Sequence, residues 1–136
     1  MQNSVEGQVC VVTGGGSGMG RELALLLGER RAKVAIVGRT LEKLKQTEAE
    51  LKARGAEAVS FGVDVADKSG VEALVREVVK RWGRIDVLVN NAGHNIRNRK
   101  LLVTTPEDMH SVINSNLLGT IFATQAALPH LSLIHI

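Results

Sequence analysis

The chain has 136 residues, of which 44% are hydrophobic and 23% are charged, a composition typical of one soluble globular domain. Its 17 basic residues are nearly balanced by 14 acidic ones, and aromatic residues are scarce, so a nucleic-acid partner is not expected. No apolar run approaches the roughly 20 residues of a membrane span, so no membrane partner is expected. The single cysteine, Cys10, excludes an intrachain disulfide and a multi-cysteine metal site, and it favours a reducing cytoplasm.

Short apolar runs alternate along the chain with amphipathic segments. The runs at 9–12, 34–37, 59–63 and 85–89 are rich in Val and Ile and nearly continuous, which predicts parallel strands covered on both faces. Residues at helical spacing predict four helices, with stripes at Met19, Leu23, Leu26 and Leu27; at Leu41, Leu44 and Leu51; at Val71, Leu74, Val75, Val78 and Trp82; and at Met109, Val112, Ile113, Leu117 and Thr120. This alternation predicts an α/β fold with a Rossmann-like doubly wound parallel sheet, truncated after the fourth strand and fourth helix. Right-handed crossovers give the strand order 3-2-1-4.

Residues that begin or end helices support these boundaries. Thr40 and Thr105 are expected at helix N-caps, and Pro106 is expected at a first helical position. Glycines are expected near three helix exits, at positions Gly28, Gly55 and Gly83.

A glycine-rich segment, Thr13-Gly14-Gly15-Gly16-Ser17-Gly18-Met19-Gly20, joins the first strand to the first helix. Glycines allow a tight turn and let backbone N–H groups approach a pyrophosphate at the positive end of the helix. A purely structural turn is the less favoured alternative, because five glycines stand between a buried strand and an amphipathic helix. The spacing is not G-x-G-x-x-G, because Met19 stands where the third glycine should be. It is not a P-loop, because Arg21 and Glu22 replace Lys-Ser/Thr.

The segment reads T-G-x-x-x-G-x-G and resembles that of the short-chain dehydrogenase/reductase family. Later motifs agree: Asp64-Val65 ends the third strand, Asn90-Asn91-Ala92-Gly93 ends the fourth strand, and Asn116-Leu117-Leu118-Gly119 lies in the fourth helix. The resemblance covers residues 8 to about 130, with Asp64 beside the adenine. It implies that the following residues bind an NAD(P) cofactor: Thr13, Gly14, Gly16, Ser17, Gly18, Met19, Gly20, Asp64, Val65, Asn91, Ala92 and Gly93.

The end of the second strand bears on the choice between NAD and NADP. In NAD-preferring enzymes an acid there binds the ribose 2′-hydroxyl, and that acid would repel a 2′-phosphate. Here Gly38 stands at about that position and Arg39 follows it. Arg39, with Thr40 adding a hydrogen bond, predicts a preference for NADP(H), with NAD(H) as the second choice. The alternative is that Arg39 is a solvated residue before a helix. A second basic residue, often found before Gly18 in NADP-preferring relatives, is replaced here by Ser17.

Asn116 interrupts an apolar stripe, at helical spacing from Met109, Val112 and Ile113, and is expected to face inward. From spacing alone, a hydrogen-bonded structural amide is the favoured role. The resemblance implies a catalytic role instead, in which the asparagine kinks the helix and holds a water in a proton relay to a catalytic lysine. For Asn91, structural support of the strand end is favoured.

Two features of the loop after the fourth strand are expected to be of lesser importance. His94 is expected to be a loop residue rather than a catalytic one. Arg97, Arg99 and Lys100 are expected on a flexible loop, with attraction of an anionic substrate as the alternative.

The sequence contains no tyrosine. The family transfers a hydride between nicotinamide C4 and an alcohol or carbonyl carbon, and it supplies a Ser and a Tyr-x-x-x-Lys pair beyond the fourth helix as the acid–base centre. We therefore expect residues 1–130 to be the N-terminal part of an NAD(P)-binding Rossmann domain, inactive as a fragment. Residues 131–136 match a translated transposase mosaic-end adapter and are expected to be a non-native tail.

For the complete protein, the sequence predicts an NAD(P)-dependent oxidoreductase with a small alcohol or carbonyl substrate, and the resemblance implies a homodimer or homotetramer. The alternative is a non-catalytic NAD(P)-binding or sensor module, because such a module would share every motif described above.

Overall fold

Four parallel strands form the middle layer of the structure, a computed structural model that describes residues 4–131. They are β1 (Val9–Thr13), β2 (Lys33–Gly38), β3 (Ala58–Gly62) and β4 (Val87–Val89). Their order in the sheet is β3-β2-β1-β4, which confirms the predicted topology. The chain runs from β1 to β2 and β3 on one side and then crosses to β4 on the other, so the strand order reverses between β1 and β4. Pockets for ligands form beyond the carboxyl ends of strands at such a point.

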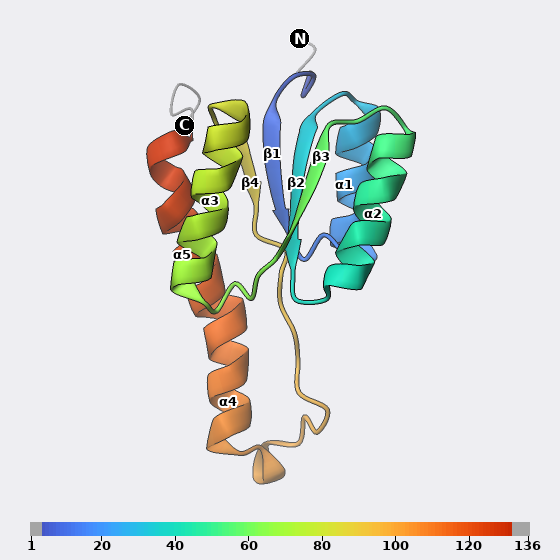
Figure 1. Cartoon of the computed structure of the whole chain (residues 1–136). Coiled ribbons are helices and arrows are strands. Elements are labelled where there is room, and N and C mark those ends of the chain that lie inside the picture. The colour runs from blue at the N-terminus through green and yellow to red at the C-terminus, as the bar shows by residue number, and fades with distance from the viewer. Residues whose placement is uncertain (1–3, 132–136) are drawn as a thin grey trace.

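Helices cover both faces of the sheet (Figure 1). Helices α1 (Gly18–Glu29) and α2 (Leu41–Ala53) lie on one face, whereas α3 (Lys68–Trp82) and α5 (Gly119–Ala127) lie on the other. Helix α4 (Pro106–Ile113) extends beyond the carboxyl end of the sheet and continues into α5 through a π-helical segment, η2 (Asn114–Leu118). Two short 3₁₀ helices, η1 (Leu101–Val103) and η3 (Leu128–His130), complete the elements.

Two hydrophobic cores lie on opposite faces of β1. Cys10 and Val12 pack with residues of α1 and α2, whereas Val9 and Val11 pack with residues of α3 and α5. Successive side chains of a strand point to opposite faces, so every residue of β1 is buried. The continuous apolar runs of the sequence are explained by this two-sided burial.

The buried face of α1 differs from the predicted one. Met19 and Leu26, two members of the expected stripe, are 83% and 51% exposed. The buried residues are mostly small: Gly20, Ala24, Leu25 and Gly28. Gly28 lies inside the helix rather than past its exit, and a Cβ there would come within 2.5 Å of the Leu51 side chain. Close packing between α1 and α2, and not a turn, therefore explains this glycine.

The long helical region from α4 to α5 also buries a different face from the expected one. Met109, Ile113 and Leu117 are exposed, by 41%, 48% and 55%. The buried positions carry small side chains instead: Ser115, Gly119, Ala123 and Ala127. A Cβ at Gly119 would lie 2.5 Å from the side chain of Val65, so small residues are needed where the helix approaches the chain after β3. Asn116 is consequently exposed and does not face inward.

Other predicted helix features are confirmed. Helix α3 buries Val71, Leu74, Val75 and Val78 and ends at Gly83, whose φ is +78°. Thr105 caps α4 in a capping box with Asp108, and Pro106 is its first residue. Thr40 occupies the N-cap position of α2, but its side chain makes no capping hydrogen bond.

The fourth strand begins at Val87, two residues later than predicted. Ile85 instead forms an isolated parallel bridge with Leu131. The remainder of the expected non-native tail, 132–136, lies outside the described residues. Among the helices of residues 4–131, none is both long enough and apolar enough to cross a membrane.

Candidate nucleotide-binding site

A pocket of about 270 Å³ opens beyond the carboxyl ends of the strands, between the glycine loop and the start of α2. It brings together residues that are far apart in the sequence. Nine of the residues predicted to bind cofactor line it: Gly14, Gly16, Ser17, Arg39, Thr40, Asp64, Val65, Ala92 and Gly93. The other predicted site residues do not line it: Thr13, Gly18, Met19, Gly20, Asn91 and Asn116.

The glycine loop packs tightly against the end of the sheet. The N–H of Gly14 donates to the Val37 carbonyl at 2.7 Å, and the φ of Gly14 is +68°. A Cβ at Gly20 would lie 2.2 Å from the carbonyl oxygen of Gly14, so α1 can begin this close to β1 only with glycine at that position. The first backbone N–H groups of α1, which have no partner within the helix, therefore lie beside the loop and suit a phosphate.

Thr13 and Asn91 hold the floor behind the pocket. The Thr13 hydroxyl oxygen accepts the N–H groups of Asn91 and Ala92, at 3.0 and 2.9 Å. In return, the Asn91 side-chain amide donates to the carbonyls of Thr13 and Gly14, at 3.2 and 3.3 Å. These bonds join the ends of β1 and β4, as the structural role expected of Asn91 requires.

The positive charge of the pocket comes from the junction between β2 and α2. Arg39 follows β2 directly, and Lys43 lies in the first turn of α2; both line the pocket. Sequence reasoning found Arg39 but missed Lys43. The available signal was the position of Lys43 in the first turn of the helix that follows Arg39.

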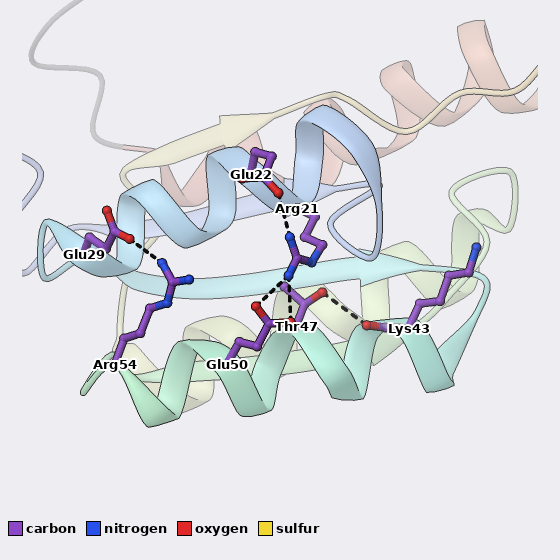
Figure 2. A network of polar contacts seen from close by, with 7 residues as sticks. All are labelled: Arg21, Glu22, Glu29, Lys43, Thr47, Glu50 and Arg54. Carbon is purple, nitrogen blue, oxygen red and sulfur yellow. Dashed lines mark hydrogen bonds and ion pairs between the residues drawn. The ribbon is translucent and has the colours of Figure 1, made fainter.

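Helix α2 is held against α1 by ion pairs (Figure 2). Arg21, the residue after Gly20, donates to both carboxylate oxygens of Glu50, at 2.7 and 2.6 Å. Arg54 and Glu29 form a second pair at the far end of the two helices. The two ion pairs hold α2 against α1 and so help to place its first turn beside the glycine loop.

Asp64 and Val65, which follow β3 beside the end of β2, also line the pocket. The Asp64 carboxylate is exposed and accepts the N–H of Ala66 at 2.9 Å, whereas Val65 is buried. Sequence reasoning also missed Ser115, a buried residue of the π-helical segment that lines the pocket. Its small side chain gave no sequence signal, because π-helical geometry has no simple apolar period.

Asn116 binds the loop after β4 although it lies outside the pocket lining. Its Nδ2 donates to the carbonyl of His94 at 3.0 Å, and its Oδ1 accepts the His94 N–H at 2.9 Å. The His94 ring lies 2.9 Å, Nε2 to Oγ, from Ser111 on α4. Asn116 belongs to the π-helical segment η2.

The residues present fit a phosphorylated dinucleotide. Gly16 lines the pocket, and a Cβ there would lie 3.4 Å from the side chains of Lys43 and Leu44. A larger residue at this position would therefore reduce the space available to a ligand. Two basic residues, Arg39 and Lys43, and one acidic residue, Asp64, are among the residues that line the pocket. No group of three or more potential metal ligands was found in residues 4–131.

Comparison with known proteins gives consistent matches. A family model described as short chain dehydrogenase matches residues 8–134. The chain is 37% identical over 127 residues to the (2S)-[(R)-hydroxy(phenyl)methyl]succinyl-CoA dehydrogenase subunit BbsD of Thauera aromatica, covering 93% of this chain and 51% of that protein. It is 40% identical over 121 residues to the 3-oxoacyl-[acyl-carrier-protein] reductase of Mus musculus, covering 89% and 50%. The chain thus spans about half the length of the curated relatives it matches.

Solved structures show the same arrangement. A metagenomic short-chain oxidoreductase in complex with NADP is 36% identical with a TM-score of 0.88, covering 94% of this chain and 58% of that one. A short chain dehydrogenase/reductase from Burkholderia phymatum in complex with NAD is 28% identical with a TM-score of 0.90, covering 94% and 45%.

Proposed function

Because the chain belongs to the short-chain dehydrogenase family, we propose that the complete protein is an NADP(H)-dependent oxidoreductase acting on a small alcohol or carbonyl compound. The observation that carries this proposal is the pocket at the carboxyl ends of the strands, where Gly38 and Arg39 stand at the end of β2. An arginine without an acid at this position favours a ribose 2′-phosphate over a 2′-hydroxyl. When bound, the nicotinamide supplies or accepts the hydride.

The glycine loop and its neighbours would hold the cofactor. Backbone N–H groups at the start of α1 bind the pyrophosphate, and Asp64 with Val65 binds the adenine. Ala92 and Gly93 have little or no side chain and let the nicotinamide half approach the end of β4. Thr13 and Asn91 act from behind the pocket by fixing the strand ends.

Asn116 is proposed to hold a water of the proton relay. Its side-chain amide already binds the N–H and the carbonyl of His94. The main-chain carbonyl of Asn116 is therefore the group proposed to bind that water. This carbonyl also accepts the Thr120 hydroxyl at 3.0 Å, and a carbonyl oxygen has a second lone pair for a water.

The acid–base centre is proposed to lie outside the printed sequence, which contains no tyrosine. In this proposal residues 1–130 form the N-terminal part of the Rossmann domain, and 131–136 derive from an adapter. A reducing cytoplasm is proposed as the compartment, in keeping with buried, unpaired Cys10. A non-catalytic NAD(P)-binding module is the alternative, and a genomic continuation without a Ser and a Tyr-x-x-x-Lys pair would favour it.

The complete protein is proposed to form a homodimer or homotetramer. The supporting observation is the exposed stripe on α4, η2 and α5, which consists of Met109, Ile113, Leu117 and Ile121. These residues repeat every four positions and so form a continuous apolar ridge. A ridge of this kind marks an interaction site when it is exposed on a protein surface.

The cofactor preference is tested by the Michaelis constants of the complete enzyme for NADP(H) and NAD(H). We expect the smaller constant for NADP(H), because Arg39 compensates the charge of the 2′-phosphate. An Arg39→Asp substitution should shift the preference towards NAD(H) by about tenfold or more, equivalent to about 1.4 kcal/mol. Tighter use of NAD(H) by the unmodified enzyme would contradict the proposal.

A further inference from the structure

Arg39 lies in the segment between β2 and α2, Lys43 lies in the first turn of α2, and both line the pocket. Like charges that line one pocket repel each other. In residues 4–131, no carboxylate lies within ion-pair distance of either side chain. An anion bound between or beside the two cations would therefore reduce their mutual repulsion.

Lys43 differs from the other lysines of α2. Lys45 and Lys52 both bind the carboxylate of Glu48, at 3.0 and 2.6 Å. The side chain of Lys43 extends away from the Arg21–Glu50 ion pair (Figure 2). Its amine is therefore free to bind a ligand in the pocket that it lines.

The stem of Lys43 packs beside the glycine loop. A Cβ built at Gly16 would lie 3.4 Å from the Cβ of Lys43, so the lysine begins directly next to the loop. The Arg21–Glu50 ion pair and the bond from the Thr47 hydroxyl to the Lys43 carbonyl, at 3.2 Å, fix this part of α2. The backbone of Lys43 is thus held at a defined place beside the glycine loop.

We propose that Lys43 is a second cation for the 2′-phosphate of NADP(H) and determines cofactor specificity together with Arg39. The inference rests on the proposed NADP(H) function. A phosphate monoester carries about −1.5 to −2 charges at neutral pH, which one guanidinium cannot fully compensate. Arg39 and Lys43 are the cationic residues that line the pocket, and Asp64 is the one acidic residue among its lining residues.

The test compares adenosine 2′,5′-bisphosphate with adenosine 5′-monophosphate by calorimetric titration of the 136-residue chain. These ligands differ only in the 2′-phosphate, and neither contains the nicotinamide half of the cofactor. For the unmodified chain we expect tighter binding of the bisphosphate. A Lys43→Ala substitution should weaken bisphosphate binding by about tenfold, the range of one charge-assisted hydrogen bond, and leave monophosphate binding unchanged.

Two matched variants complete the test. Lys43→Arg keeps the charge and should retain most of the preference for the bisphosphate. Lys80→Ala removes one exposed cation from α3, outside the pocket, and should change neither affinity. Unchanged monophosphate binding shows that Lys43→Ala has left the fold intact.

The outcomes separate the inference from the proposed function. If the unmodified chain binds both ligands equally, the NADP(H) preference itself is wrong. If it prefers the bisphosphate and Lys43→Ala keeps that preference in full, the preference stands and the role of Lys43 is wrong. Binding of neither ligand would overturn both.

Discussion

Glu48 is a charged residue in a buried place, on the side of α2 that faces β3. Only 8% of the residue is exposed. Burial raises the pKa of its carboxyl, but hydrogen bonds from Lys52, Ser60 and Lys45 outweigh burial and lower the pKa to about 2. A buried carboxylate with this many donors stabilises its charged form, and through Ser60 it joins α2 to the edge strand β3.

We expect the chain to lose stability in acid because of Glu48. The folded-state pKa of about 2 is lower than the usual 4.5, so this contribution is complete above about pH 4.5 and is lost as the pH falls towards 2. A Glu48→Gln substitution should lower the free energy of unfolding at neutral pH, by up to about 3 kcal/mol. It should also flatten the pH dependence in that window, measured by urea denaturation.

The matched control for this prediction is Glu77→Gln, which changes an exposed carboxylate in the middle of α3. That variant should keep both the stability and the acid dependence of the unmodified chain. Equal acid dependence of Glu48→Gln and the unmodified chain would show that Glu48 does not carry the effect.

At the scale of the elements, the glycine loop separates two roles of glycine. A Cβ at Gly20 would collide with the backbone carbonyl of Gly14 at 2.2 Å, whereas a Cβ at Gly16 would make ordinary contacts of 3.4 Å or more. Gly20 is therefore needed for the fold, and Gly16 only borders the space for a ligand.

This difference predicts opposite effects of two alanine substitutions. Gly20→Ala should destabilise the chain by about 1–3 kcal/mol, the usual cost of overpacking. Gly16→Ala should leave stability nearly unchanged and should weaken nucleotide binding instead. Thermal unfolding and calorimetric titration measure the two effects, and equal losses of stability in both variants would be inconsistent with the loop geometry.

The strands could be predicted from the sequence because burial on both faces produces unbroken apolar runs such as 9–12 and 34–37. The face of α3 could also be predicted. The buried faces of α1 and of the region from η2 to α5 could not, because they pack largely through small residues and leave larger residues such as Met19 and Leu117 exposed. In the site, glycines and Arg39 have recognisable spacing. Lys43 and Ser115 become pocket residues only once α2 and the π-helical segment are placed against the loop.

At the scale of the whole molecule, the described residues provide the pocket proposed to bind the cofactor, whereas the proposed acid–base centre lies elsewhere. We therefore expect the purified 136-residue protein to show no carbonyl reduction with NADPH, followed by absorbance at the nicotinamide wavelength. The complete protein from the same locus is the positive control. Measurable turnover by the 136-residue chain would show that its own residues supply the proton donor.

The central claim, that the pocket beyond β1 and β2 binds a phosphorylated nicotinamide dinucleotide, is tested most directly by titrating NADP⁺ into the 136-residue chain in a calorimeter. The pocket geometry predicts saturable binding at one site per chain, tighter for NADP⁺ than for NAD⁺. No saturable binding by a chain that circular dichroism shows to be folded, or tighter binding of NAD⁺, would contradict it.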